Sequence, residues 1–378
     1  MPPVAHEKRN VPSMTRYAGT PDFVHGSRSR VGVLLVNLGT PGAPTPAAVR
    51  RYLAEFLWDP RVVEKPRAPW WLVLHGIILR TRPGRSAHAY RKIWTPAGSP
   101  LMVESRALMD ALSARLRLRS GDRVQVDLAM TYGNPSIGEA LARMRRDGIR
   151  RLLVLPMYPQ YSATTTAAVF DRIARGLAGW RWIPELRMVN DYWGEDAYVA
   201  AIADSISARW QARGRTHLVF SFHSIPKRCL LAGDPYHCQC HATARRVAAR
   251  LGLAEGEWAI GFQSRFGREE WLRPHVDELL HGYAHAGPKR VTLVCPGFAT
   301  DCLETLEEID LRYREAFLSH GGESFDYVPC LNAAEAQVAL YEHLVLKHAQ
   351  GWPELGTFDD AAAGAESRRR ALAHGATN

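Results

Sequence analysis

Two kinds of side chain that could do chemistry follow one apolar run near the middle of the chain. The run LVFSF ends in His223, a proline turn comes next, and Cys229, Cys238 and Cys240 follow closely. A neutral imidazole can accept a proton near neutral pH or bind a borderline divalent ion. Thiolates can bind zinc or an iron–sulfur cluster. His223 is therefore either a working residue or a hydrogen-bonded residue at a strand end, and the cysteines are either metal ligands or reduced thiols.

A second stretch, CPGFATDCLETLEEID, supplies carboxylates. A Pro-Gly turn ends an apolar run there, and a helix is predicted to begin near Asp301. Asp301 and Glu304 have the spacing of a capping box, which would give Glu304 a structural explanation. Glu304 and Glu308 lie four residues apart on one helical face, where like charges repel. A bound cation or a proton relay would explain that pair, provided that His223 faces it.

These residues must be positioned by an α/β scaffold. Short β-rich runs alternate with segments of helical spacing: VGVLLVNL, RVQVDLAM, RLLVLPMY, WIPELRMVN, HLVFSF, WAIGFQS and RVTLVCPGF. Near-continuous apolar strands that alternate with helices predict parallel sheets covered on both faces. The rhythm restarts after VNDYWGED, and 378 residues exceed what one core usually spans. We predict two Rossmann-like domains, each a parallel sheet flanked by helices.

The predicted boundaries follow composition and rhythm. A flexible leader at 1–29 precedes an N-terminal α/β domain at 30–180, and a C-terminal α/β domain at 190–330 carries the histidine and glutamates. A helix at 333–350 is expected to pack back on the first domain. The tail at 356–378, rich in Ala, Gly and Arg, is predicted to be disordered.

The strand ends are where a ligand is expected, because open parallel sheets bind ligands beyond the carboxyl ends of their strands. These ends are Asn37 to Pro41, Met130 to Pro135, Pro156 to Ser162, Ser221 to Pro226, Gln263 to Gly267, and Pro296 to Glu304. The glycine-rich NLGTPGAP lacks the dinucleotide and phosphate-loop patterns, which argues against a nucleotide. Ser136 and Ser162 are predicted helix N-caps.

Composition narrows the class of protein. Apolar residues make up 46% of the chain and the formal charge is +10, but the arginines are scattered. The sequence has no run of like charges and no basic cluster of the kind that binds nucleic acid, so no nucleic-acid partner is expected. The N-terminus has no apolar segment of the secretory kind, and WWLVLHGIIL at 70–79 is about half a bilayer span. A cytoplasmic protein with reduced cysteines follows.

Eight motifs, taken together and in order, resemble those of the ferrochelatase family. They are LLVNLGTP, GSPL, YGNPS, PMYPQYS, SFHSIP, GDPY, FQSRFG and PGFATDCLETLEE. The resemblance as a whole runs from about Val31 to the helix ending near Gln350. The resemblance implies the two-domain chelatase fold and an enzyme that inserts Fe(II) into protoporphyrin IX to form protohaem. It makes His223 and Glu304 the catalytic and metal-binding pair, with Asp301 and Glu308 extending an acidic path toward solvent.

The resemblance also implies a porphyrin site. Arg80 and Arg82 of HGIILRTRP are candidate partners of the propionates, because a forked guanidinium suits a carboxylate. The apolar run 70–79 would form a lip of the cleft and a possible peripheral contact with the inner face of the membrane. The remaining candidate porphyrin contacts are Leu38, Tyr132, Tyr161, Trp193 and Phe298.

Several points depart from the family or stay open. Thr131 occupies a position where many relatives have arginine, and Leu38 occupies one where some have Tyr or Met. The family's [2Fe–2S] arrangement is absent, since Ala163 replaces its first ligand and no cysteine follows Cys330. A cluster or zinc site at Cys229, Cys238 and Cys240 remains an alternative to reduced thiols. So do a cobalt chelatase of corrin synthesis and a non-catalytic porphyrin or haem carrier, and the protein could be a monomer or a homodimer.

Overall fold

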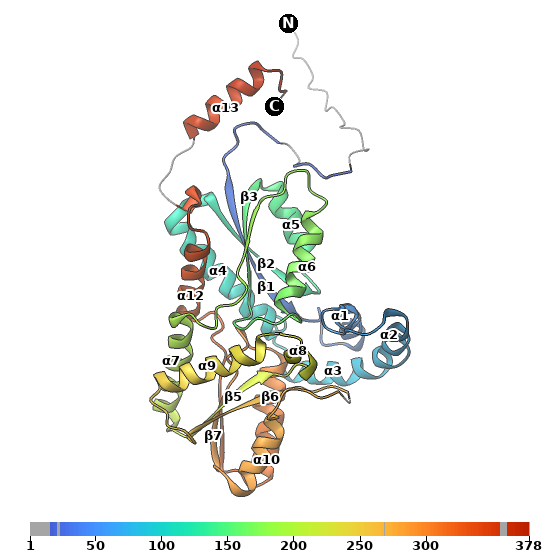
Figure 1. Cartoon of the computed structure of the whole chain (residues 1–378), viewed down its shortest axis with the longest axis vertical. Helices are drawn as coiled ribbons and strands as arrows, with labels where there is room; N and C mark the ends of the chain where they lie inside the picture. Colours follow the sequence, from blue (N-terminus) through green and yellow to red (C-terminus); the bar gives the residue numbers. More distant parts are fainter. Residues whose placement is uncertain (1–15, 21–22, 268, 356–360, 378) are drawn as a thin grey trace.

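The structure is a computed structural model that describes residues 16–20, 23–267, 269–355 and 361–377. Two four-stranded parallel sheets form its frame, one above the other in Figure 1. The first has the order β2-β1-β3-β4 and the second the order β6-β5-β7-β8. The predicted α/β architecture with two parallel sheets is thus confirmed, and both sheets share one topology.

The strands of the two sheets have the following bounds. In the first sheet they are β1 Arg30–Gly39, β2 Val124–Tyr132, β3 Ile149–Pro156 and β4 Glu185–Met188. In the second sheet they are β5 His217–His223, β6 Trp258–Gln263, β7 Arg290–Val294 and β8 Ser324–Val328. The central strands are buried on both faces, as their apolar sequences require. The sequence missed β8, whose five residues include a polar Asp326 and whose place is at the sheet edge.

Helices cover both sheets, and some have clear sequence signals. They are α1 Pro46–Trp58, α2 Arg67–Val73, α3 Leu79–Ile93, α4 Pro100–Ser120, α5 Ile137–Arg146, α6 Thr166–Leu177, α7 Asp196–Arg213, α8 Lys227–Leu231, α9 Tyr236–Arg250, α10 Val276–Ala286, α11 Arg314–Ser319, α12 Glu335–His348 and α13 Ala361–Ala373. Ser136 caps α5 through the predicted side-chain bond, within a complete capping box with Glu139. Ser162 does not cap α6, which begins after Thr165; its hydroxyl donates to Asp234 instead, at 3.0 Å.

Two segments are π-helical, which sequence patterns do not reveal. They are η1 Leu74–Ile78, between α2 and α3, and η3 Glu304–Tyr313, which runs directly into α11. Short 3₁₀ turns also occur at η2 Gly121–Arg123 and η4 Pro353–Leu355. Because π-helical turns are rare and often accompany functional sites, η3 draws attention to the glutamates it carries.

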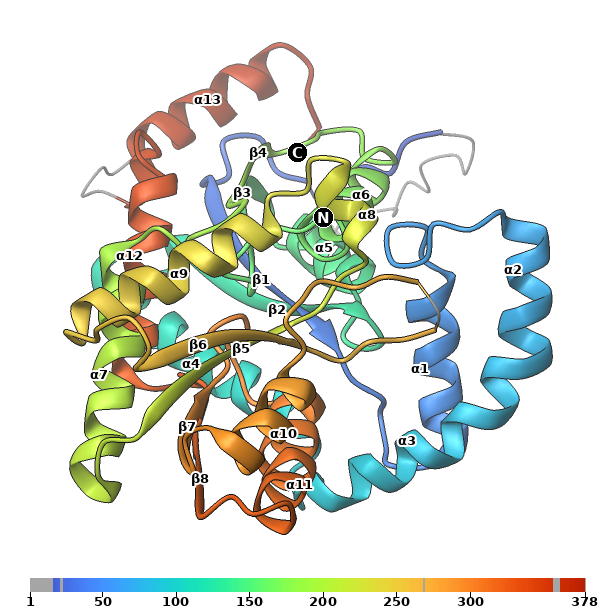
Figure 2. The same ribbon diagram turned by 60° about the horizontal axis from the view of Figure 1, so that its bottom comes forward.

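The helices α1, α2, η1 and α3 form an arm that projects from the side of the molecule, as Figures 1 and 2 both show. The arm is inserted between β1 and β2. It is packed around a small core of its own, which contains Leu57, Trp70, Leu74 and Ile78. No helix among the described residues is long and apolar enough to cross a membrane.

One large apolar core joins the two sheets. It contains Leu35 of β1, Phe220 of β5, Tyr198 of α7 and Leu344 of α12. The helix α12 contacts both α4, which lies on the first sheet, and α7. The sheets are therefore held against each other by shared packing as well as by the chain between them.

The chain ends differ in part from the sequence prediction. Residues 1–15, 21 and 22 of the predicted leader lie outside the described residues, whereas Ala18 pairs with Trp180. Within the predicted disordered tail, 361–373 form α13, where Glu366 forms ion pairs with Arg369 and Arg370. Alanine and ion pairs one helical turn apart favour a helix locally. The prediction of disorder rested on composition, which does not include the spacing of the charged residues. The strand β4 lies past 180, the predicted end of the first domain, and pairs with β3.

Candidate active site

His223 is the last residue of β5, at the carboxyl edge of the second sheet. Its half-buried ring is oriented by a hydrogen bond from Nδ1 to the carbonyl oxygen of Ser224, at 2.7 Å. Since a carbonyl can only accept, Nδ1 carries the proton and Nε2 of the neutral ring keeps its lone pair. The imidazole is thus held in the tautomer that can accept a proton or bind a metal through Nε2.

Gln263 connects His223 to the glutamate helix. It ends β6 and lies opposite His223 in the parallel register. Its amide is fully enclosed: Oε1 accepts from the Ser221 hydroxyl at 2.6 Å, and Nε2 donates to the carbonyl oxygen of Glu304 at 2.9 Å. One side chain therefore fixes the start of η3 against the strands that carry His223. The sequence marked Gln263 only as a strand end.

Glu304 is half-buried at the first turn of η3. In the part of the chain that the structure describes, no lysine or arginine pairs with its carboxylate. Burial, followed by the negative charge of Glu304, raises the pKa of the buried Cys302 thiol. Burial and the same charge raise the pKa of the Tyr90 hydroxyl on the arm. Glu304 is thus an uncompensated carboxylate at the meeting point of the arm and the second sheet, as a cation site requires.

Glu308 lies one turn further along η3 and is well supported. Its carboxylate accepts hydrogen bonds from the Ser264 hydroxyl and, at 3.0 Å, from the Tyr313 hydroxyl. Arg312 approaches it at 3.6 Å from the exposed side. Next to it, Glu307 pairs with Lys92 of α3 at 3.1 Å, which ties η3 to the arm. The three glutamates therefore differ in their surroundings, and within the described ranges Glu304 is the one that no lysine or arginine pairs with.

Asp301 does not form the predicted capping box. Its carboxylate accepts hydrogen bonds from Thr305 at 3.0 Å, Tyr327 at 2.6 Å and Asn332 at 2.7 Å. These donors join η3 to β8 and to the loop before α12, and Asp301 itself is buried. A carboxylate occupied on both oxygens serves the fold, which argues against the predicted place of Asp301 in an acidic path toward solvent.

Three of the predicted porphyrin contacts lie at the inner ends of the sheets. Leu38, near the end of β1, is half-buried, and so is Phe298, which packs between the two cores of the second sheet. Tyr132 is fully enclosed at the end of β2, with the Arg172 guanidinium 4.6 Å from its ring centroid. Gly39 lies so close to Tyr132 that a Cβ would meet its carbonyl oxygen at 1.8 Å. Tyr132 therefore supports the site wall from behind.

The other candidates are distributed around these strand ends. The Tyr161 amide donates to Gln239 of α9 at 2.6 Å, and the Trp193 amide donates to Pro159 at 2.9 Å. Both side chains are half-buried. Thr131, the departure noted above, donates to the carbonyl oxygen of Asn37 at 3.2 Å. Its hydroxyl thus links two strands, and it leaves no charge at this position.

The arm carries the basic candidates. Arg80 is exposed, whereas Arg82 is half-buried with its guanidinium 4.4 Å from the ring centroid of Phe266, in the loop after β6. Burial, followed by the nearby charge of Arg85, lowers the pKa of Arg82. No carboxylate pairs with Arg82 within the described residues. An anionic ligand group would supply the missing counter-charge.

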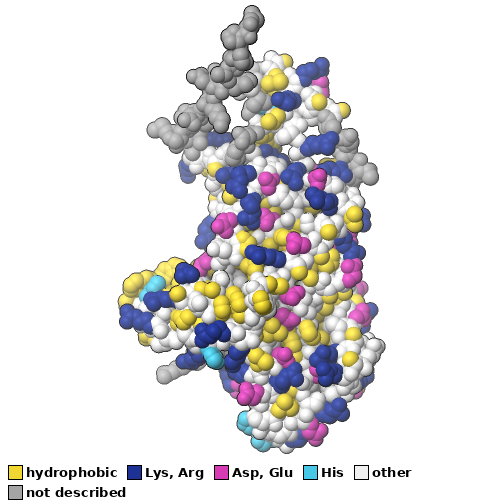
Figure 3. All heavy atoms as spheres, turned by 180° about the vertical axis from the view of Figure 1, so that it is seen from behind, with side chains coloured by type: hydrophobic (Ala, Val, Ile, Leu, Met, Phe, Trp, Pro, Cys, Tyr) yellow, Lys and Arg dark blue, Asp and Glu magenta, His cyan; other side chains and the backbone are white. Residues whose placement is uncertain are grey.

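The arm also has an exposed apolar surface. Its residues are Trp71, Leu72, Val73 and Ile77, with exposed fractions of 51%, 65%, 40% and 60%. Figure 3 shows a yellow patch at the end of the projecting arm with basic side chains around it. This arm patch belongs to the run 70–79, which the sequence singled out. Contiguous exposed apolar surface of this kind marks an interaction site.

The cysteines do not form a ligand set. Cys229 and Cys240 are buried and Cys238 is exposed. Burial raises the pKa of the Cys229 and Cys240 thiols, which disfavours the thiolate that a metal needs. Among the residues that the structure describes, no three histidine, cysteine or acidic side chains stand ready to hold a metal ion. A cluster or zinc centre at these three cysteines is not supported.

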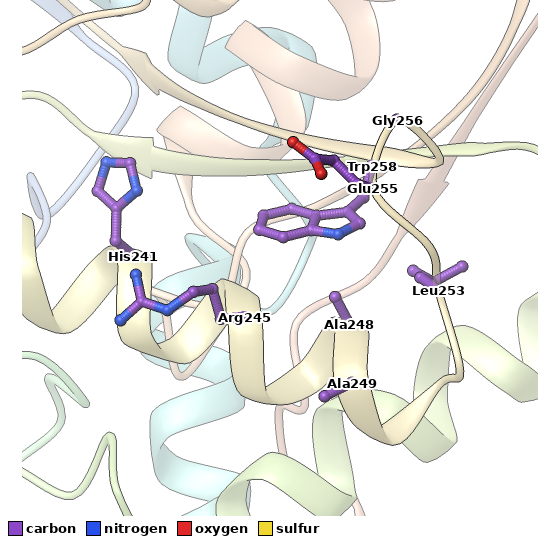
Figure 4. Close-up of a pocket in the computed structure, with 8 residues that line it drawn as sticks. All are labelled: His241, Arg245, Ala248, Ala249, Leu253, Glu255, Gly256 and Trp258. Carbon is purple, nitrogen blue, oxygen red and sulfur yellow. The ribbon is translucent and has the colours of Figure 1, made fainter.

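A cavity of about 430 Å³ lies apart from these residues. It is lined by His241 and Arg245 of α9 and by Trp258, the first residue of β6. Figure 4 shows His241 and Arg245 on successive turns of α9, with the Trp258 indole across from the helix. Trp258 begins the strand that Gln263 ends, so this cavity extends toward the amino end of β6. Neither His223 nor Glu304 lines it.

Fold and site together define a chelatase-like α/β protein, with an imidazole and a carboxylate at the carboxyl edge of one sheet. A structure described as SirB from Bacillus subtilis with Fe3+ has the same fold: its TM-score is 0.52 at 12% identity, covering 87% of this chain and 99% of that chain. The ferrochelatase family model matches residues 30–349.

Curated relatives agree with the family match. A protein named ferrochelatase from Thioalkalivibrio sulfidiphilus is 52% identical over 96% of this chain and 99% of its own. One of the same name from Nitrosococcus oceani is 54% identical over 95% of this chain and 99% of its own. The chain belongs to the ferrochelatase family.

Proposed function

We propose that this protein inserts Fe(II) into protoporphyrin IX and releases protohaem, the last step of haem synthesis. Family membership supports this activity. The observation that carries the assignment to a site is the arrangement around Gln263, which is the register partner of His223 and donates to the backbone carbonyl oxygen of Glu304. His223 keeps Nε2 for a proton or a metal, and within the described residues no lysine or arginine pairs with the Glu304 carboxylate. A base and a cation ligand at one sheet edge are what metal insertion into a porphyrin requires.

The proton balance of the reaction assigns a task to His223. Two pyrrole N–H bonds break as four nitrogen–iron bonds form, so Fe(II) enters and two protons leave. His223 Nε2 is the base that accepts a pyrrole proton, because Nδ1 is already committed to the Ser224 carbonyl. The fixed tautomer means that no ring reorientation precedes the transfer.

Glu304 is the proposed ligand for the entering iron, and Glu308 is the next carboxylate outward. The charge of Glu304 is uncompensated, so it attracts a partly dehydrated divalent ion. Glu308 is oriented by Ser264 and Tyr313 and lies beside the half-exposed Arg312. This order suits a path along η3, with protons moving out or the metal moving in between Glu304 and the surface.

Arg82 is the proposed propionate partner on the arm. It is half-buried and lacks an acidic partner among the described residues, so a carboxylate would relieve its desolvation. Such a contact would hold the edge of the macrocycle equally in the ground state and the transition state, and so contribute to substrate binding. Leu38 and Phe298 provide apolar surface at the strand ends for the face of the macrocycle.

The arm patch is the proposed point of contact with a membrane. Its apolar side chains lie next to arginines of α2 and α3, a combination that suits the interface of an anionic bilayer. Porphyrins partition into membranes because they are apolar, so contact at the arm would place the site beside its substrate.

Membrane contact is tested by sedimentation with phosphatidylglycerol vesicles. The fraction of protein that sediments with the vesicles should fall when Trp71 and Ile77 are both changed to Ser. Leu118→Ser, which removes an apolar side chain 91% exposed on α4, is the control.

The activity is tested by anaerobic turnover. Protein, protoporphyrin IX and Fe(II) are mixed with enzyme below stoichiometry, and the loss of porphyrin fluorescence is followed. Multiple turnovers that His223→Ala abolishes, and that His343→Ala on α12 does not, would support the proposal. Tight binding without turnover would indicate a carrier, and turnover only with Co(II) and a more carboxylated tetrapyrrole would indicate the cobalt enzyme. The family match favours neither alternative.

A further inference from the structure

Three histidines far from the proposed active site form a cluster on the second sheet's outer helices. His281 and His285 lie one turn apart on α10, and His320 follows the last residue of α11. The ring centroids are 4.3 Å apart for His281 and His285, 5.3 Å for His281 and His320, and 6.3 Å for His285 and His320. All three side chains are exposed. Figure 3 shows histidine side chains (cyan) at this lower end of the molecule.

The backbone that carries the cluster is well fixed. Leu280 and Ala284 of α10 pack in the same apolar core as Phe317 of α11. Gly321 turns the chain with a φ of +102°, and a Cβ there would lie 3.2 Å from the Ala284 carbonyl oxygen. The close approach of this turn to α10 holds His320 beside the other two rings. Their proximity therefore follows from core packing.

Hydrogen bonds select the tautomer of two of the rings. His285 donates from Nδ1 to the carbonyl oxygen of His281 at 2.9 Å, and His320 donates from Nδ1 to that of Ala316 at 2.7 Å. Both neutral rings therefore present an unprotonated Nε2. A backbone carbonyl that fixes the other ring nitrogen is the usual support of a metal-binding histidine. The nearby Lys289 ammonium is bound to the carbonyls of Ala284 and His285.

We propose that this cluster binds one borderline divalent transition-metal ion, of the zinc class, at a site separate from the site of insertion. Three imidazoles on a tetrahedral ion at about 2 Å would have ring centroids about 5 Å apart. The three observed separations bracket that value. The described structure has no three such side chains placed to hold a metal ion, so binding requires the exposed rings to rotate and His285 and His320 to give up their bonds to backbone carbonyls. Exposed rings make such rotations within nanoseconds.

The location of the cluster sets it apart from Glu304. The helix formed by η3 and α11 begins at Glu304 and ends at Ser319, next to His320. At about 1.5 Å per residue, its two ends are on the order of 20 Å apart. Imidazole ligands select zinc, nickel, cobalt and ferrous iron over calcium or magnesium. The cluster is thus suited to the chemical class of ion that the enzyme uses, at a distance that excludes direct insertion.

The test is calorimetric titration of the full chain with Zn(II), in a His223→Ala, Glu304→Gln background that removes the insertion site. We expect one equivalent to bind, and the double change His281→Ala, His285→Ala to weaken binding by at least about tenfold. His320→Ala should also weaken it. In the otherwise unaltered protein, iron-insertion turnover at saturating iron should survive these changes, because none of them alters the active site.

A matched control is available on α9. His237 and His241 are also four residues apart, with ring centroids at 4.4 Å, but Nε2 of His241 is buried and no third histidine of the described residues joins them. His237→Ala should leave Zn(II) binding unchanged. Loss of binding in this control, retention of binding without His281 and His285, or no binding in the starting background would each overturn the proposal. Circular dichroism confirms that each variant is folded.

Discussion

The two sheets have the same strand order and yet differ at their carboxyl ends. The second sheet ends in an ionisable and an amide side chain, His223 and Gln263, and Gln263 donates to the carbonyl oxygen of Glu304 at the start of η3. The first ends in polar groups that are hydrogen-bonded into the fold: the Asn37 side chain donates to Ser105 at 3.0 Å and to Thr300 at 3.1 Å, and the Thr131 hydroxyl donates to the Asn37 carbonyl oxygen. One edge carries the side chains proposed for proton and metal transfer, and the other carries polar side chains that are bound into the fold.

The order of parallel strands determines which edge of a sheet can bind a ligand, but it does not determine the chemistry at that edge. Parallel strands bring their carboxyl ends together in either sheet, whatever residues are there. The chemistry depends on which side chains remain without a protein partner after folding. In the first sheet these are phenols enclosed by the core, such as Tyr132 and Tyr158, whose pKa values burial raises above the usual range for tyrosine. In the second they are Nε2 of His223, whose Nδ1 is bound to Ser224, and the Glu304 carboxylate, which has no lysine or arginine partner among the described residues.

The largest expected effect is at His223. His223→Ala should lower turnover by about 10²–10⁴-fold, because it removes the base for the pyrrole protons. Porphyrin binding, measured by fluorescence titration, should stay within a few-fold of that of the unaltered protein. Equal turnover in the variant would place the base elsewhere and remove the functional difference between the two sheets.

Substitution of Glu304 should lower turnover more than substitution of Glu308. Glu308→Gln should lower turnover by about 10-fold, as expected of an outer-shell group, and Glu304→Gln by clearly more. The reason is that no lysine or arginine of the described part of the chain pairs with Glu304, whereas Glu308 is held by Ser264 and Tyr313. The measurement is turnover against Fe(II) concentration. A larger loss at Glu308 would reverse the proposed order along η3.

Gln263 and Asn37 provide a matched pair, one from each sheet. Either change to Leu leaves buried hydroxyl groups without a partner and should lower the free energy of unfolding by about 1–3 kcal/mol. Only Gln263→Leu also releases the start of η3, so it should reduce turnover about 10-fold, and Asn37→Leu should reduce it less. Urea unfolding and turnover are measured together. Equal losses of turnover would mean that both amides act through stability alone.

The arm allows a smaller test of substrate binding. Arg82→Ala should raise the KM for protoporphyrin about 10-fold with little change in kcat, since the contact would be equal in the ground and transition states. Arg80→Ala, which removes an exposed guanidinium two residues away, should have less effect. A porphyrin without propionates should bind both variants and the unaltered protein alike. If Arg80→Ala raised the KM more than Arg82→Ala, the propionate would instead be bound at the exposed Arg80.

The smallest expected effect is a pH dependence of stability beside the second sheet. Burial, then His237 and Arg245, lowers the pKa of His241 to about 4, against about 6.5 for an unfolded histidine. The unfolded chain therefore binds more protons between these values, so stability falls as the pH drops from about 6.5 to about 4. His241→Gln should flatten the plot of Tm against pH in that window. An unchanged slope would assign the acid sensitivity to other groups.

The sequence by itself determined the architecture and most of the candidate residues. Apolar runs such as VGVLLVNL and HLVFSF can be satisfied only as buried parallel strands, so periodicity and alternation with helices were sufficient for the fold. His223 and Gln263 come at the ends of such runs, so the sequence predicted both at the edge of a sheet where ligands bind. The motifs in order indicated the family, which the family match confirmed.

The tertiary structure alone decided which of those residues are free to react. Asp301 and Glu304 look equivalent in the sequence, but Tyr327 and Asn332, distant in the chain, occupy Asp301. The π-helical turns of η3, the enclosure of Tyr132 and the meeting of His320 with α10 also depend on long-range packing. Local patterns report what a segment prefers, whereas partners contributed by remote segments determine which polar groups are satisfied and which remain available for chemistry.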